Sequence, residues 1–155
     1  MPFYYSIEST HTTSATAATE ADAVRTTTGS TRTTAFSRLT LGASGTAQDN
    51  QVMGKLWRMS VASTAGSAFT PKPRDNSAPA SVFTANTAPT IGTKETNPTL
   101  VLPFNSRAFV QWVALNPDEA IVLAAGGGAN GNIDILDEQA AGVAVALRYG
   151  LTAYE

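Results

Sequence analysis

Apolar and polar side chains alternate in the stretch Leu-Trp-Arg-Met-Ser-Val that begins at residue 56. Trp57, Met59 and Val61 should face one side of an extended chain, because successive side chains of a strand point to opposite faces of a sheet. The Ser, Thr, Ala and Gly residues that follow permit a turn, and Pro71 and Pro73 cannot donate hydrogen bonds to a ladder. The pattern therefore predicts a half-buried strand that leaves the core and becomes a long, proline-containing loop.

Further strands are predicted wherever short alternating or apolar runs lie between turn-forming residues. These runs are residues 34–41, 81–84, 99–104, 108–114, 120–124, 133–135 and 142–149. We expect the third of them to end at Pro103, and the continuously apolar run 120–124 to be buried on both faces. In the last strand, every second residue from Val143 to Tyr149 is expected to face inward. About seven to nine short strands without an amphipathic helix predict an all-β fold, an antiparallel β-sandwich or jelly roll.

The first 34 residues differ in composition from the rest of the chain. Residues 3–7 are aromatic and β-prone, so they form either a first strand or an arm that docks on a neighbouring molecule. Residues 9–34 are almost entirely Thr, Ser and Ala, and they bury too little apolar surface to offset the entropy lost on ordering. They are either a flexible arm or an extended strand ordered by a partner subunit. We therefore divide the chain into an extended N-terminal arm (residues 1–34) and a β-sandwich domain (residues 35–155), and expect the sandwich to fold without the arm.

Composition and charge narrow the class of protein. A chain of 155 residues fits one domain, and the absence of Cys excludes disulfides and Cys-based metal sites. Charged residues make up 14% of the chain, against about 25% in an ordinary soluble domain, and a surface with so few charges suits a protein that packs against others.

The net charge of the chain is −2 and its basic residues form no stripe, which argues against nucleic acid as a direct partner. No signal peptide or membrane-spanning stretch is apparent, so we expect synthesis in the cytoplasm and no membrane partner.

The sequence contains no catalytic signature. Nucleophilic catalysis requires a base beside the nucleophile, and the single histidine, His11, lies in the Thr-rich segment, where we expect it to be exposed and inert. No Ser lies in a Gly-x-Ser-x-Gly elbow. The glycine-rich run 126–132 lacks the Lys of a phosphate-binding loop and is predicted to connect two strands. We therefore expect a protein that is not an enzyme and that has no catalytic residues and no cofactor.

Two groups of residues suggest binding chemistry, and each has a simpler interpretation. Asp134, Asp137 and Glu138 offer carboxylates to a cation, but their spacing matches no calcium loop, so a solvated acidic turn is favoured and no metal site is predicted. Trp57 and Trp112 would form a platform for a sugar if they were exposed. Their place beside aliphatic residues in alternating strands favours the core instead.

The order of features over residues 51–155 resembles a known family. The segments that carry the resemblance are the strand with Leu56 and Arg58, Ser63-Thr64-Ala65-Gly66, Thr70-Pro71, Phe83-Thr84-Ala85, Ala88-Pro89-Thr90, Leu102-Pro103-Phe104-Asn105-Ser106-Arg107-Ala108, the strand with Trp112, and Pro117-Asp118-Glu119. This order is similar to that of jelly-roll capsid decoration, or cement, proteins, which are encoded among the head genes of tailed bacteriophages.

The resemblance implies a non-enzymatic structural protein on the outer surface of a bacteriophage virion. Such a protein would bind, as a homotrimer, to the outside of the shell formed by the major capsid protein. Binding to the assembled shell alone would stabilise the head against internal DNA pressure. The residues expected to make assembly contacts are Tyr4, Tyr5, Ile7, Pro71, Lys72, Pro73 and Arg74.

A carbohydrate-binding β-sandwich module on a virion or cell surface is the alternative function. The two functions differ in aromatic exposure, because a sugar-binding module has to present an aromatic ring to solvent, whereas a capsid-binding module does not. The exposure of Trp57 and Trp112 in the folded chain therefore distinguishes them.

Overall fold

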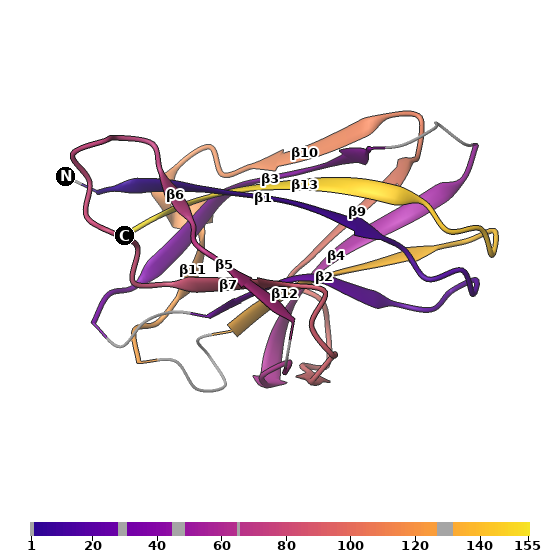
Figure 1. Ribbon diagram of the computed structural model, residues 1–155, viewed down its shortest axis with the longest axis horizontal. Coiled ribbons are helices and arrows are strands. Elements are labelled where there is room, and N and C mark those ends of the chain that lie inside the picture. Colours follow the sequence, from indigo (N-terminus) through magenta and orange to yellow (C-terminus); the bar gives the residue numbers. More distant parts are fainter. Residues whose placement is uncertain (1, 28–30, 45–48, 65, 127–131) are drawn as a thin grey trace.

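A computed structural model describes residues 2–27, 31–44, 49–64, 66–126 and 132–155 of the chain. These residues form strands, turns and one short 3₁₀ helix, η1 (Pro117–Glu119), and include no α-helix. The strands are β1 (Tyr4–Thr12), β2 (Ala21–Thr27), β3 (Thr34–Ala43), β4 (Gln51–Val61), β5 (Ser67–Phe69), β6 (Lys72–Pro73), β7 (Thr84–Thr87), β8 (Thr93–Lys94), β9 (Leu100–Asn105), β10 (Phe109–Val113), β11 (Ile121–Leu123), β12 (Asn132–Gln139) and β13 (Ala146–Tyr154). Figure 1 shows the long strands in two layers.

The strands form two antiparallel sheets. The first sheet has the order β10-β3-β13-β1-β6, with β11 also paired to β3. The second sheet has the order β5-β7-β2-β12-β4-β8, with β9 also paired to β4. The ladders are nested along the chain, since β1 pairs with β13, β2 with β12, β3 with β10 and β11, and β4 with β9. This is the winding of a jelly roll, and the predicted all-β sandwich is confirmed.

The hydrophobic core lies between the two sheets and is built from alternate residues of the long strands. The large side chains buried in it are Tyr5, Ile7, Phe36, Leu39, Leu41, Leu56, Phe83, Leu123, Ile133, Ile135 and Tyr149. The sheets approach closely at Gly54 of β4, where an added Cβ would overlap the Leu41 side chain of the opposite sheet. The alternation predicted for β4 is confirmed, with Leu56 facing this core and Trp57 facing away from it.

The Thr-rich N-terminal segment belongs to these sheets. β1 pairs with β13 over nine residues, and β2 pairs with both β12 and β7. The neighbours that one of our two interpretations assigned to a partner subunit are therefore strands of the same chain. β-branched Thr suits this arrangement, because its side chain packs well on a pleated surface once the backbone is paired. Since Tyr5 and Ile7 are core residues, the described part of residues 1–34 is integrated into the sandwich.

Three predictions about single strands are corrected. Pro103 does not end its strand but lies inside β9, which pairs with β4 alone among the described strands. Proline is tolerated on such an edge, where the missing N–H is not needed by a second neighbour. Val122 in β11 is exposed, so the run 120–124 is buried on one face only. Val143 is exposed as well, because β13 begins only at Ala146.

The outer face of the second sheet carries an ion-pair network. Lys55 Nζ lies 2.9 Å from both Glu20 Oε1 and Glu138 Oε2, and Lys94 also pairs with Glu20. Burial acts to raise the pKa of Glu20, but hydrogen bonds from Lys94 and Lys55 outweigh it and hold this pKa below its usual value. Burial likewise acts to lower the pKa of Lys55, and its two carboxylate partners raise it instead. The network therefore favours the charged form of both groups in the folded state.

Replacing Ile7 with Ala should lower the free energy of unfolding by about 2–5 kcal/mol, because the substitution leaves a cavity in the core. Thr10 is exposed in the same strand, so Thr10→Ala is the matched control and should change stability by about 0.5 kcal/mol or less. Urea denaturation followed by circular dichroism measures both. Equal stability of the two variants would show that β1 does not belong to the core. For the same reason, we now expect a chain without residues 1–34 to be unfolded.

The Glu20 network predicts how stability depends on pH. A carboxyl group whose pKa is lowered by folding stabilises the folded state at pH values above its unfolded pKa, here near 4.5, and this contribution is lost as the pH falls through the lower folded-state pKa. The fall in Tm with acidification should therefore be shallower in Glu20→Gln than in the unmodified protein. Glu95, which is exposed, provides the control variant Glu95→Gln. Identical pH profiles for all three proteins would contradict a stabilising role of the network.

Candidate functional site

The N-terminal residues predicted to make contacts alternate between the surface and the core. Tyr4 is exposed and packs against Tyr154 of β13, with 5.6 Å between the ring centroids. Tyr5 and Ile7 are buried. They support the surface from beneath and cannot form part of it, so Tyr4 alone of these three residues is available to a partner.

The proline-containing loop lies directly beside Tyr4. Pro71 is buried, whereas Lys72, Pro73 and Arg74 are exposed. Lys72 and Pro73 form β6, which pairs antiparallel with β1 at the edge of the first sheet, and the backbone N–H of Arg74 donates to the Tyr4 carbonyl oxygen at 2.9 Å. The two regions that the sequence singled out separately therefore form one continuous surface.

The remainder of this loop is held at three points. Asp75 Oδ1 accepts from the backbone N–H and the hydroxyl of Ser77, both at 2.8 Å, and these bonds lower the pKa of Asp75. The Tyr5 hydroxyl donates to the Pro79 carbonyl oxygen at 3.0 Å. Burial, together with the Glu155 carboxylate, raises the pKa of Tyr5, which keeps the hydroxyl protonated and able to donate.

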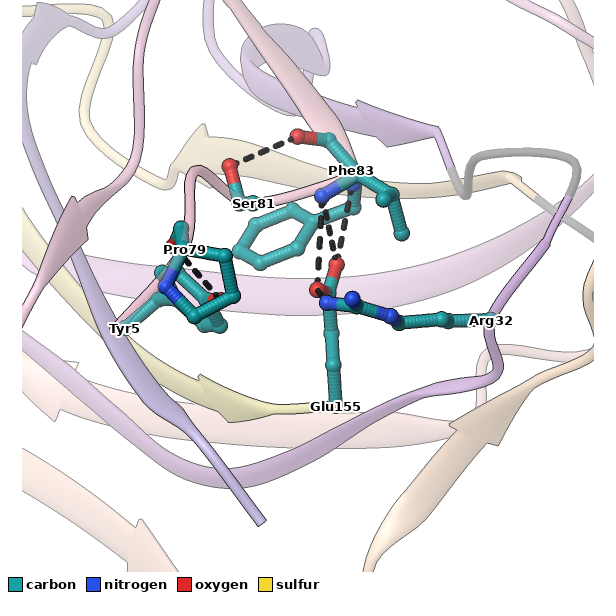
Figure 2. A network of polar contacts seen from close by, with 7 residues as sticks. Tyr5, Arg32, Pro79, Ser81, Phe83 and Glu155 are labelled. Carbon is teal, nitrogen blue, oxygen red and sulfur yellow. Dashed lines mark hydrogen bonds and ion pairs between the residues drawn. The ribbon is translucent and has the colours of Figure 1, made fainter. Parts of the chain in front are cut away.

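The third group that holds the loop is the carboxylate of Glu155, whose side chain is fully buried. Figure 2 shows the carboxylate facing the chain that precedes β7, where Oε1 accepts from the backbone N–H groups of Val82 at 2.9 Å and Phe83 at 3.0 Å. Arg32 Nη1 lies 3.4 Å from the other carboxylate oxygen. Backbone hydrogen bonds between Phe3 and Glu155 extend the ladder of β1 and β13. Glu155 therefore fixes the loop to the end of the sandwich, a role that its sequence position did not indicate.

The outer face of the first sheet adjoins the loop and contains a depression of about 330 Å³. We call this depression the arginine trough, because Arg38, Arg74 and Arg148 line it together with Glu8, Phe109 and Gly150. Arg74 belongs to the predicted contact residues, so the trough continues the surface formed by Tyr4 and β6. The alternation of the sequence places Arg148 on an outward face, but it does not show that the other two arginines lie beside it.

A polar cluster inside the sandwich corrects the prediction for His11. The His11 side chain is only 12% exposed, and its Nδ1 lies 2.7 Å from Asp137 Oδ2. The Tyr149 hydroxyl donates to the same oxygen. His11 and Tyr149 belong to the first sheet and Asp137 to the second, so the cluster joins the two sheets through the interior. Such partners are what a fully buried carboxylate requires.

The acidic residues considered for a cation site do not converge. Asp134 and Asp137 are three residues apart in β12 and therefore face opposite sides of the sheet. Asp134 accepts from the Ser63 hydroxyl, and Glu138 pairs with Lys55. The predicted acidic turn is thus a buried strand, and the described residues include no cluster of His, Cys, Asp or Glu that could hold a metal ion.

The two tryptophans are not available as a sugar platform. Trp57 is 8% exposed and packs in a small apolar cluster on the outer face of the second sheet, with Lys94 Nζ 4.7 Å from its ring centroid. Trp112 is half-buried against the main core. The predicted core position therefore agrees with Trp112, which packs against the main core, whereas Trp57 is buried in a separate cluster outside it. Most of the predicted glycine connection, residues 127–131, lies outside the described residues.

No model of a known protein family matches the chain, and no curated protein matches it either. Within the part of the chain that the structure describes, no helix is long and apolar enough to cross a membrane. The function proposed below is therefore argued from the residues of this surface.

Replacing Glu155 with Ala should destabilise the protein by about 1–3 kcal/mol, because two buried backbone N–H groups lose their acceptor. The loop should also become a better protease substrate, since a fixed segment resists cleavage. Glu95→Ala, at an exposed position, is the control. Limited proteolysis with mass spectrometry locates the cuts. A Glu155→Ala protein whose cleavage between residues 74 and 82 is as slow as that of the control would contradict the anchoring role.

Proposed function

We propose that this chain is a capsid decoration, or cement, protein of a tailed bacteriophage that binds the outside of the shell and stabilises the head. The observation that supports it best is the surface on which Tyr4, Lys72 and Arg74 meet beside the outer face of the first sheet. A ligand that binds only the assembled shell stabilises that shell by mass action. Such a protein requires a rigid contact surface, and the hydrogen bonds to Glu155 and Tyr5 hold this one in place.

Fold and composition are compatible with this function. Jelly rolls occur in both viral capsid and lectin domains. The fold is therefore compatible with capsid decoration and with carbohydrate binding, and it does not distinguish them. The low charged fraction of 14% lets neighbouring molecules approach without burying unpaired charges. On a repetitive shell, many modest contacts are sufficient.

The exposed apolar residues supply a surface for contacts between copies of the chain. Leu115 is 86% exposed, and Val113, two residues before it at the end of β10, is 43% exposed. Apolar side chains that are clustered on a surface in this way are typical of interaction sites. The proposal therefore includes a homotrimer in which these side chains are buried between subunits.

The carbohydrate-binding alternative has less support. Its expected platform residues, Trp57 and Trp112, are buried and half-buried. A sugar that stacks on an aromatic ring needs an open ring face. Phe109 is 73% exposed, but the one carboxylate that lines the same depression, Glu8, is already paired with Arg148 and so is less available to sugar hydroxyls.

Co-sedimentation with empty shells of the phage's major capsid protein tests the proposed function. The protein should sediment with the shells and should raise their melting temperature. Light scattering of the free protein should give about 48 kDa, three times the chain mass of 16.1 kDa. Lys72→Glu should weaken shell binding by about tenfold, equivalent to about 1.4 kcal/mol.

Arg107→Glu is the control for this experiment, because Arg107 is exposed and lies in the turn after β9, outside the surface of Tyr4 and β6. It should sediment with the shells as the unmodified protein does. A monomer that stays in the supernatant, and whose Trp fluorescence shifts on addition of a polysaccharide, would replace the cement function with the carbohydrate-binding one.

A further inference from the structure

The arginine trough has a regular construction that follows from the register of four strands. Across the outer face, Gln111 of β10 lies opposite Thr40 of β3, Thr40 opposite Gly150 of β13, and Gly150 opposite Glu8 of β1. Side chains in this row are small at its centre. A Cβ added at Gly150 would meet only the Thr40 Cβ, at 3.9 Å, so the floor of the trough is open.

Larger residues stand around this floor in the two neighbouring rows. One row contains Phe109 and Arg148, which lie on either side of Gly42. On the other side lies Arg38, opposite both Val113 and Thr152. Arg74 closes the trough from the proline-containing loop. The small central residues and the long surrounding ones together produce the depression.

The charge of the trough is opposite in sign to that of the whole chain. Three of the ten basic residues line it, together with a single carboxylate, Glu8. Glu8 Oε2 is already bound to Arg148 Nη2 at 3.0 Å. Among the described residues, no ion pair joins Arg38 or Arg74 to a carboxylate. Two guanidinium groups therefore remain available to an anion from outside.

Arg38 is also held in position. With its carboxamide oxygen turned toward the guanidinium, Gln111 accepts a hydrogen bond from Arg38 Nη2 at 2.6 Å. An arginine that is fixed by a neutral partner keeps its full charge and loses less side-chain entropy when it binds a ligand. The planar fork of a guanidinium matches a carboxylate through two parallel hydrogen bonds.

We propose that the arginine trough binds an acidic segment of the shell protein, with Asp or Glu carboxylates of that segment placed between Arg38 and Arg74. This inference rests on the proposed function, and it names the chemistry of the partner surface. The floor adds the hydroxyl of Thr40 as a further donor. A volume of about 330 Å³ is sufficient for one or two acidic side chains.

An acidic peptide fits the trough better than an acidic polysaccharide. The charged donors of the trough are three arginines, and its one carboxylate is engaged with Arg148, so sugar hydroxyls would find few strong acceptors. Phe109, 73% exposed, forms an apolar part of the rim. Such a rim suits the apolar residues that flank an acidic side chain in a protein.

Titration with a short oligoglutamate peptide tests the chemistry, with an oligoglutamine peptide of the same length as its control. Binding is followed through the backbone NMR signals of Gly150 and Thr40. Only the glutamate peptide should shift these signals, and raised salt should weaken its binding. Arg38→Gln and Arg74→Gln should each weaken it by about tenfold. Neither substitution leaves a carboxylate of the chain without a partner.

Gly150→Val provides a steric test of the same site. The position has ordinary backbone angles and open space above it, so the variant should fold and should lose peptide binding because its side chain fills the floor. Arg107→Gln, outside the trough, should bind the peptide as the unmodified protein does. Equal binding of both peptides, or full binding by Gly150→Val, would overturn the proposal.

Co-sedimentation of the same variants with shells separates this proposal from the proposed function. Arg38→Gln and Arg74→Gln should sediment less than Arg107→Gln. If all variants sediment equally with shells, the cement function stands and the trough is not its contact. If the glutamate peptide binds through the arginines but no protein sediments, the carboxylate chemistry stands and the shell is not the partner. Tighter binding of polygalacturonate than of the peptide would assign the trough to an acidic polysaccharide and overturn the proposal.

Discussion

The ladder between β1 and β13 is the interaction on which the rest of the structure depends. It joins the two ends of the described chain over nine residues and continues through the backbone hydrogen bonds of Phe3 and Glu155. It places Tyr5 and Ile7 in the core on one face and Tyr4 and Glu8 on the other. Without this ladder the first sheet would lose its centre, and β6 would have no strand to pair with.

The same ladder connects stability to the proposed contact surface. Glu155 directly follows β13, so the pairing of β13 positions its carboxylate beneath the chain that leads into β7. The loop that carries Lys72 and Arg74 is fixed between β1 and this carboxylate. A short paired edge strand such as β6 also leaves little free ladder on which a wrong partner could add a strand. The surface is therefore rigid because it is built on the most extensively paired part of the fold.

The two faces of the sandwich use polar residues differently. Inside, Asp137 is held by His11 and Tyr149, and this buried cluster joins the sheets. Outside, Arg38 and Arg74 have no carboxylate partner among the described residues. A buried charge requires a hydrogen-bonding or ionic partner within the chain, whereas an exposed charge is hydrated and can remain unpaired until a partner molecule binds. This difference is why the outer arginines, and not the inner carboxylates, are the residues that we assign to binding.

Much of the fold was predictable from the sequence because alternation is a local property. The runs 34–41, 56–61 and 108–114 were predicted to be extended, and β3, β4 and β10 confirm this. The pattern did not show that Leu56, and not Trp57, faces the main core. Tyr4 and Arg74 were also named from the sequence as expected contact residues, although nothing in the sequence showed that they touch each other.

Only the tertiary structure decided how those local patterns are used. Residues 9–34 have no strong pattern of their own, and their strands form because β12, β13 and β7 supply hydrogen-bonding partners. Pro103 remains in a strand because β9 lies on an edge, and His11 is buried because Asp137 comes from the opposite sheet. The trough joins residues from β1, β3, β10 and β13 with Arg74. Where the pattern is clear, the sequence by itself determined which segments are extended and which side chains share a face. The register between distant strands decided which of those faces meet, because strand pairing depends on partners that are far apart in the chain.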